Sequence, residues 1–344
     1  MKHIKRIFAV LLGFVFFGAG FLKLMDPVGA GLVVGEYCKF LHLGFLAPAS
    51  GVLGVAMALL EAVTGVVLIT GAFPVLAAAV SGIMLLFFTV LTFVMWRVNP
   101  AMDCGCFGEA IHLTHLQSFL KNVVLCVLWA AAFLPFRSIR KPRKIKYVST
   151  AIALLSLVAF TVWSLLSVPQ IDFTPFAPGA VLAQAQEVPD ADAPLLSISD
   201  SDGDYCDELL ASGTLLVISA YDPDLLSDKA VERLYNCAAA AADADVRPIF
   251  IAAGDSDAAE GSGAATFSAD RRELMTLNRS NGGATLLQDG MIVAKWPSRA
   301  LPDTDKIAVL ASMDPAEAMV KENTPKRLKL QGFLLYVFAV VLLL

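Results

Sequence analysis

Two cysteines, Cys104 and Cys106, are separated by a single glycine in the stretch NPAMDCGCFGEAIHLTH, Asn99 to His115. A disulfide between them would close a very small ring, and strain in such a ring makes the bond easier to reduce. The pair therefore suits thiol–disulfide exchange, in which one thiolate attacks a partner and the other thiol resolves the mixed disulfide.

The residues around the pair shape its chemistry. Gly105 has no Cβ to obstruct a tight turn, and Phe107 and Gly108 let the chain fold back toward the next helix. Asp103 works against an activated thiolate, because a neighbouring negative charge raises the pKa of a thiol. A nearby cation would have the opposite effect, and the candidates in sequence are Arg97, His112 and His115.

Two other uses of the pair stay open. Cys104 and Cys106 with His112 and His115 form a candidate four-ligand metal set, although the C-x-C-x5-H-x2-H spacing is not a standard zinc pattern. The two cysteines also suit a structural clip, or free thiols that line a loop.

The remaining four cysteines carry weaker predictions. Cys38 is a candidate relay partner for the pair, and Cys126 is most simply a small core residue of a membrane span. Cys206 and Cys237 suit a structural disulfide or two free thiols, and their spacing is not that of a CxxC active site.

The elements that must position the pair are membrane spans. Hydrophobic residues make up 57% of the 344-residue chain and charged residues only 17%, which excludes an ordinary soluble protein. A helix needs roughly 20 apolar residues to cross a bilayer. The apolar blocks are Ile7–Leu24, Phe45–Gly71, Ala72–Trp96, Ser118–Phe136, Tyr147–Val168 and Leu330–Leu344. The last is either a short span or one interrupted at the end of this sequence.

Glu61, Lys23 and Asp26 are ionisable residues in or beside these spans. Glu61, in the middle of the second, is costly there unless it faces the bundle interior and finds a partner, so it is either a proton- or quinone-related site or a buried polar clip. For Lys23 and Asp26, at the outer end of the first span, we expect a snorkelling lysine and an end-capping aspartate.

The charges are divided between two parts of the chain. Residues 172–322 contain 26 acidic and 10 basic residues, a net charge of −16, and the remainder has a net charge of +11. The acidity argues against a nucleic-acid partner and against binding to an anionic membrane surface. The basic clusters MKHIKR and RSIRKPRKIK predict a cytoplasmic N-terminus, with the cysteine loop and the acidic domain on the outer side.

The acidic domain has the pattern of an α/β fold. It reads as a buried strand at Thr214–Tyr221, a helix at Asp228–Ala244, a strand at Arg247–Gly254, a helix capped by Ser268 and a hairpin turned at Asp289–Gly290. This order is expected of a thioredoxin-like domain. The loop after the first strand reads YDPDLL, without CxxC, and GGAT replaces the usual proline before the hairpin. We therefore expect this domain to bind a partner protein without redox chemistry of its own.

The segments GFVFFGAGFLKLMDP, ALLEAVTGVVLITG and DCGCFG together resemble the DoxX/MauE superfamily of small four-helix membrane proteins. The first two segments resemble DoxX proteins generally, and the third is similar to the MauE branch. The resemblance covers roughly residues 1–140 and implies a redox-associated role for Cys104 and Cys106, its matching positions. MauE proteins are associated with maturation of methylamine dehydrogenase, and DoxX-type proteins with sulfur or thiol oxidation that feeds a quinone.

We therefore expect an α-helical membrane bundle, which consists of a DoxX-like four-helix bundle and additional spans. This bundle carries an extracytoplasmic α/β domain with a thioredoxin-like fold. The divisions are 1–140 for the bundle, 141–170 for a fifth span, 171–325 for the acidic domain and 326–344 for a terminal span. We expect a protein of the bacterial inner membrane that exchanges disulfides with a periplasmic thiol or disulfide protein. A quinone acceptor is suggested by analogy only, and no other cofactor is evident. The rivals are a non-catalytic assembly factor and a metal-handling protein.

Overall fold

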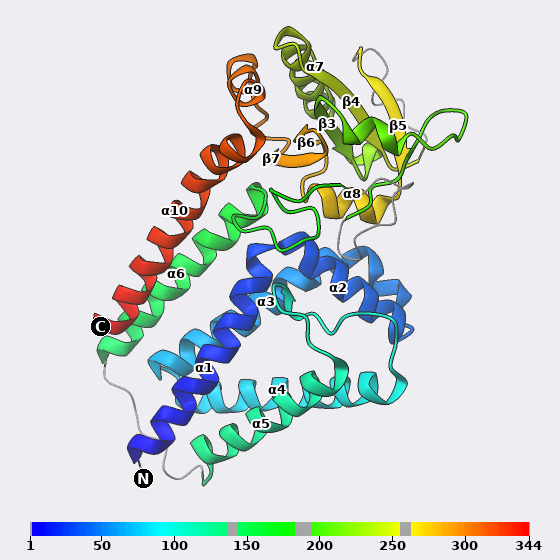
Figure 1. Ribbon diagram of the computed structural model, residues 1–344. Helices are drawn as coiled ribbons and strands as arrows, with labels where there is room; N and C mark the ends of the chain where they lie inside the picture. Colours follow the sequence, from blue (N-terminus) through cyan, green and yellow to red (C-terminus); the bar gives the residue numbers. More distant parts are fainter. Residues whose placement is uncertain (1, 136–143, 183–193, 255–262, 344) are drawn as a thin grey trace. The chain divides into compact units, whose positions relative to one another are not determined.

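The computed structural model describes residues 2–135, 144–182, 194–254 and 263–343 (Figure 1). The chain divides into two compact units, one formed by Met1–Ser164 with Gly332–Leu344 and the other by Leu165–Gln331. Most of the basic connector RSIRKPRKIK falls outside the described residues, so its predicted place in the cytoplasm stays a prediction.

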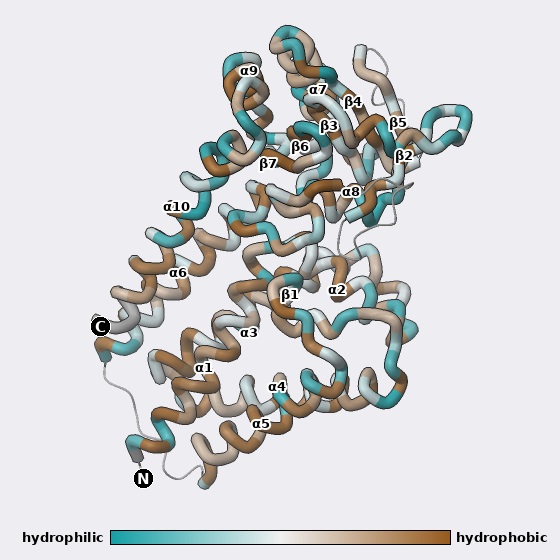
Figure 2. The backbone as a smooth tube through the Cα atoms, viewed as in Figure 1, coloured by the Kyte–Doolittle hydropathy of each residue, from teal (hydrophilic) through white to brown (hydrophobic). Residues whose placement is uncertain are grey.

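The first unit is built from long apolar helices, which Figure 2 shows as predominantly brown. Five of them are long and apolar enough to cross a membrane: α1 (Lys2–Met25), α3 (Ser50–Thr70), α4 (Pro74–Val98), α5 (His115–Phe133) and α6 (Lys144–Leu166). The first five predicted spans are therefore confirmed. The sixth, Leu330–Leu344, falls in α10 (Pro315–Leu343), which is not among the candidate spans of the described residues, so it stays a prediction.

Small residues bring α1 and α3 into close contact. A Cβ atom on Gly20 would lie 2.4 Å from the Ala62 backbone nitrogen, and one on Gly65 would lie 2.3 Å from the Phe17 nitrogen. Lipid supplies no hydrophobic drive for helices to associate, so close backbone packing at such residues has to hold them together. This contact fixes the position of Lys23 on α1 relative to Glu61 on α3.

The segment after α1 is a helix, α2 (Pro27–Phe40). Asp26 caps the start of α2, with its carboxylate accepting a hydrogen bond from the Gly29 backbone N–H at 2.9 Å. The prediction that Asp26 caps the end of the first span was therefore wrong. Pro27 disfavours helical geometry at Asp26, and the free N–H groups of a new helix are the natural donors to a carboxylate.

The second unit is a mixed α/β domain with one six-stranded sheet, in the order β2-β5-β4-β3-β6-β7. Strands β3, β4 and β5 are parallel to one another, and the other neighbouring pairs are antiparallel. The strands are β2 (Ile198–Ser199), β3 (Thr214–Ala220), β4 (Arg247–Ala252), β5 (Ala265–Ala269), β6 (Gly283–Gln288) and β7 (Met291–Trp296). Helices α7 (Asp228–Asp243), α8 (Arg271–Leu277) and α9 (Thr304–Ala311) complete the domain with the start of α10.

The predicted strands β3 and β4, helix α7 and the β6–β7 hairpin are confirmed. Asp289 and Gly290 turn the hairpin with φ values of 48° and 77°, the left-handed conformations of this turn type. The predicted cap was wrong: Ser268 lies in β5, paired with Ala252 of β4. Helix α8 begins after Asp270, whose carboxylate accepts hydrogen bonds from the backbone N–H groups of Arg272 and Glu273.

Cys206 and Cys237 do not form the disulfide that their shared domain allowed. Both are free thiols, and they pack into different cores. Cys206 packs with Leu215 and Val217 of β3, whereas Cys237 of α7 packs with Leu216. Because successive side chains of a strand point to opposite faces, the sheet separates the two cysteines.

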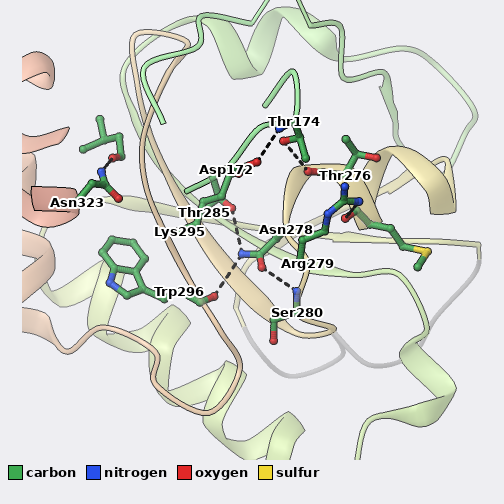
Figure 3. Close-up of polar contacts among 12 residues, drawn as sticks. Asp172, Thr174, Thr276, Asn278, Arg279, Ser280, Thr285, Lys295, Trp296 and Asn323 are labelled. Carbon is green, nitrogen blue, oxygen red and sulfur yellow. Dashed lines mark hydrogen bonds and ion pairs between the residues drawn. The ribbon is translucent and has the colours of Figure 1, made fainter. Parts of the chain in front are cut away.

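A buried ion pair fastens the segment after α6 to the sheet (Figure 3). Lys295 Nζ lies 2.6 Å from Asp172 Oδ2, and both side chains are at most 7% exposed. The Asp172 carboxylate also accepts from the Thr174 N–H at 2.9 Å. Beside it, Asn278 donates to the carbonyls of Ala284 and Trp296. This part of the domain is a closed network of satisfied polar groups.

Candidate functional site

The cysteine loop is held firmly at both ends. Asn99, in the left-handed conformation with φ of 50°, ends α4. Thr114 caps the start of α5 in a reciprocal capping box with Gln117. The two ends are joined by His115, whose ring nitrogens lie 3.1 Å from Asn99 Oδ1 and 2.9 Å from the Met102 carbonyl oxygen.

Between these anchors the chain makes a tight turn at the thiols. Gly105 and Gly108 both have positive φ, 53° and 62°, and the Gly108 N–H donates to the Gly105 carbonyl at 3.2 Å. A Cβ atom on Gly105 would lie 2.4 Å from a methyl carbon of Val33 on α2. The Tyr37 hydroxyl, also on α2, donates to the carbonyl of Cys104. The glycines expected to shape this turn thus do so, and α2 closes over it.

The two thiols are inequivalent. Cys104 is 2% exposed and packs with Leu91 and Met95 of α4, whereas Cys106 is half-buried. The Cys104 thiol donates a hydrogen bond to Cys106, which lowers the pKa of Cys106 well below that of an ordinary thiol. The charges of Lys121 and Lys23 lower it further, against the opposing effect of burial. The same hydrogen bond, together with burial, raises the pKa of Cys104.

This asymmetry assigns different chemistry to each sulfur. A thiolate, not a thiol, is the nucleophile in thiol–disulfide exchange, so the lowered pKa makes Cys106 the better suited of the two to that chemistry.

A cavity of about 60 Å³ lies among α1 to α5 and the cysteine loop. Its walls are mostly apolar, and this volume is enough for a few water molecules. The titratable and charged side chains that line it are Lys23, Tyr37, Glu61, Lys121, Cys104 and Cys106. The cysteine pair and the predicted intramembrane residue Glu61 therefore share one cavity.

Glu61 has the interior partner that its position in a span requires. Both of its carboxylate oxygens lie 2.8 Å from Lys23 Nζ, and the two residues are 3% and 9% exposed. The prediction of a snorkelling Lys23 was therefore wrong. At this depth a carboxylate two hydrogen bonds away is a better partner for the ammonium group than distant water.

Asp103, His112 and His115 do not line the cavity beside the cysteines. Asp103 Oδ2 lies 3.3 Å from His112 Nδ1, and both side chains are more than half exposed. Asp103 is not among the main causes of the pKa shifts at the two cysteines, so its expected opposition to the thiolate stays a prediction. Within the described ranges no group of three or more His, Cys, Asp or Glu side chains is arranged to hold a metal ion, so the four-ligand set is not assembled.

Lys121 of α5 is a residue of this candidate site that the sequence reasoning missed. Its Nζ lies 4.7 Å from the centroid of the Phe107 ring, and it hydrogen-bonds to the side chain of Cys106. Neither Arg97, His112 nor His115, the expected cations, lines the cavity. A signal was available, because Lys121 is an ionisable residue inside the predicted span Ser118–Phe136, and such residues mark functional sites by default.

The remaining membrane-unit cysteines lie outside this cavity. Cys38 is buried on α2. Cys126 packs in the bundle core, with its Sγ 3.4 Å from the Thr89 hydroxyl oxygen. The expected core role of Cys126 fits this position, and the relay role of Cys38 stays a prediction.

Comparison with known proteins supports the assignment of the membrane part. No match was found among curated proteins or among solved structures. The five apolar helices make the chain a multi-pass membrane protein. Its residues 1–136, which include α1 to α5 and the cysteine loop, match the family model described as methylamine utilisation protein MauE.

Proposed function

We propose that this protein is a membrane maturation factor that exchanges disulfides with an extracytoplasmic protein through Cys104 and Cys106. The observation that carries the proposal is the setting of Cys106, between the Cys104 thiol and two lysine ammonium groups. The match of residues 1–136 to a MauE model, a family named for methylamine utilisation, fits a maturation role.

The geometry favours the oxidising direction. Stabilisation of the Cys106 thiolate stabilises the reduced pair, and a stabilised reduced form makes the corresponding disulfide a stronger oxidant. Strain in the small Cys104–Cys106 ring adds to the same effect. We therefore propose that the pair accepts electrons from a client dithiol.

The exchange proceeds in two displacements. A client thiolate attacks Cys106 Sγ, the sulfur–sulfur bond to Cys104 breaks, and Cys104 leaves as a thiolate that takes up a proton. The second client thiolate then attacks the client sulfur that is bonded to Cys106 in the mixed disulfide. This step forms the client disulfide and releases Cys106 as a thiolate beside Lys121. The client loses two electrons and gains a disulfide, and the pair gains those two electrons.

Re-oxidation of the pair needs a two-electron acceptor. We propose a membrane quinone, by analogy with membrane disulfide oxidases, with Glu61 as the group that handles protons in the bundle. The short loops and basic clusters support an inner-membrane protein with a cytoplasmic N-terminus and a periplasmic α/β unit.

The α/β unit supports a second candidate function, that of a client-binding assembly factor. The strand order β4-β3-β6-β7, with β3 and β4 parallel and β6 and β7 antiparallel, supports a thioredoxin-like fold. After β3, where such folds carry CxxC, Asp222 is instead held by Arg271 Nε at 3.0 Å and by Asn281. A scaffold without thiols at this position suits binding better than exchange.

Trapping of free thiols in cells tests the leading proposal. A single variant in which the other four cysteines are replaced leaves only Cys104 and Cys106; its substitutions are Cys38→Ser, Cys126→Ser, Cys206→Ser and Cys237→Ser. A mass-shifting alkylating agent then counts the reduced thiols of this pair. We expect a mixed population that shifts toward the dithiol when respiratory quinone is removed. A pair fixed in one state under both conditions contradicts cycling and leaves the assembly role.

A pull-down separates the two candidates. If the exchange function is right, replacing both Cys104 and Cys106 by serine abolishes client oxidation while client binding persists. If client maturation survives this double replacement, the assembly role is the correct one.

A further inference from the structure

The cavity beside the cysteines has an unequal number of cations and anions. Lys23 and Lys121 contribute two positive charges, and Glu61 contributes one negative charge. When the pair is a disulfide, one positive charge is therefore left over. When the pair is reduced, the Cys106 thiolate supplies the missing negative charge. Because an uncompensated charge in a poorly solvated site is costly, this arrangement favours the reduced pair.

Lys23 is shared between the two anions of this set. It forms two hydrogen bonds to Glu61, and its charge also acts on Cys106. The carboxylate therefore attracts the same ammonium group that stabilises the thiolate and, being negative, opposes formation of the thiolate nearby. The strength of the thiolate stabilisation depends on both members of the buried pair.

We propose that the buried Lys23–Glu61 ion pair is a positioning pair that sets the reduction potential of Cys104 and Cys106. Lys23 supports the Cys106 thiolate, and Glu61 both holds Lys23 in place and limits that support. This inference rests on the proposed exchange function and assigns two further residues to it.

The other groups that face Cys106 do not duplicate this role. Lys121 of α5 contacts the thiol directly and lies partly exposed, with the Phe107 ring against it. The Tyr37 hydroxyl of α2 is engaged by the Cys104 carbonyl. From α4 the cavity is lined only by uncharged residues, Leu85, Phe88, Leu91 and Thr92. The Lys23–Glu61 ion pair is thus the buried pair of charges beside the cysteines.

The test compares two variants whose expected effects have opposite signs. In full-length protein in detergent, Glu61→Gln removes the opposing charge and leaves Lys23 to the thiolate. We expect Cys106 to be alkylated roughly threefold to tenfold faster at pH values below its pKa, and the glutathione equilibrium to shift toward the dithiol by a similar factor. The Lys23→Met, Glu61→Gln double variant loses the supporting cation as well. Relative to wild type, its Cys106 should therefore be alkylated more slowly, and its glutathione equilibrium should shift toward the disulfide.

The exposed residue Lys39 at the end of α2 provides the matched control, since Lys39→Met removes a lysine charge without touching the cavity. If Glu61→Gln does not fold because it leaves Lys23 unpaired, the double variant, which buries no lone charge, decides the matter. The proposal is overturned if the double variant matches Lys39→Met in both alkylation rate and glutathione equilibrium.

The same measurement separates this inference from the function on which it rests. If the wild-type pair equilibrates reversibly with glutathione but the variants do not change that equilibrium, only the role of Lys23 and Glu61 is refuted. If the wild-type pair does not exchange with glutathione at all, the exchange function itself fails, and this inference fails with it.

Discussion

Each unit of this protein contains a buried lysine–carboxylate pair, and the two pairs have different surroundings. Lys23 and Glu61 line a cavity that is also lined by Cys104 and Cys106. Asp172 and Lys295 are closed in by the sheet and by the Thr174 N–H. A buried charge pair is weak proof of stability by itself, so its environment decides what it does. The first pair can respond to a new charge beside it, whereas the second fastens a segment to the domain.

The largest effect should come from the thiol that distinguishes the two sites. Cys106→Ser removes the sulfur that forms the mixed disulfide, and we expect complete loss of disulfide exchange with a model dithiol, measured in full-length protein. Cys206→Ser in the α/β unit is the matched control and should keep wild-type activity. Exchange that survives Cys106→Ser would make the cysteine loop structural and would remove the contrast between the units.

Breaking the second pair should affect stability and leave reactivity unchanged. Asp172→Asn removes the carboxylate charge that lies 2.6 Å from the buried Lys295 ammonium group. Removing one partner of a buried pair typically costs about 3–5 kcal/mol. We expect earlier proteolysis of the α/β unit during heating of the full chain, with the alkylation rate of Cys106 unchanged.

The exposed residue Asp202 offers a control for this change. Asp202→Asn should leave the resistance of the α/β unit to proteolysis at its wild-type value. If Asp172→Asn instead altered Cys106, the two pairs would not be independent.

A smaller effect is expected at Lys121. Lys121→Met removes the cation that contacts Cys106, so the pKa of Cys106 should rise and its alkylation at about pH 6 should slow by roughly tenfold. The pH profile of alkylation is the measurement, because a purely structural effect would change the amount of folded protein without moving the midpoint. An unmoved midpoint would leave the Cys104 hydrogen bond and the charge of Lys23 as the causes of thiolate stabilisation.

The smallest effect concerns acid stability of the α/β unit. Burial alone would raise the pKa of Asp172, but Lys295 and the Thr174 hydrogen bonds outweigh it and lower the pKa below its ordinary value. A lowered folded-state pKa contributes stability above the unfolded-state pKa of about 4 and loses it as the pH falls through the folded-state value. The stability difference between wild type and Asp172→Asn should therefore be constant near neutral pH and shrink only in acid. A difference that shrinks between pH 8 and 6 would contradict this assignment.

The sequence determined the parts of this protein that depend on local pattern. Runs of about 20 apolar residues have few alternatives to a membrane helix, and an Asp-Gly turn between alternating residues gives a hairpin. The positions of Cys104, Cys106 and Glu61, and the tight turn at Gly105, could all be recognised from neighbouring residues alone.

Tertiary structure decided which of these residues act together. Lys23 and Glu61 are 38 positions apart, and only the close packing of α1 on α3 at Gly20 and Gly65 turns them into a pair. Lys121 reaches Cys106 because α5 folds back along α4, and α2 closes over a turn that the sequence left open. The pKa of Cys106 is lowered first by the Cys104 thiol of its own loop and then by Lys121 and Lys23, which only the packing of the helices brings near it.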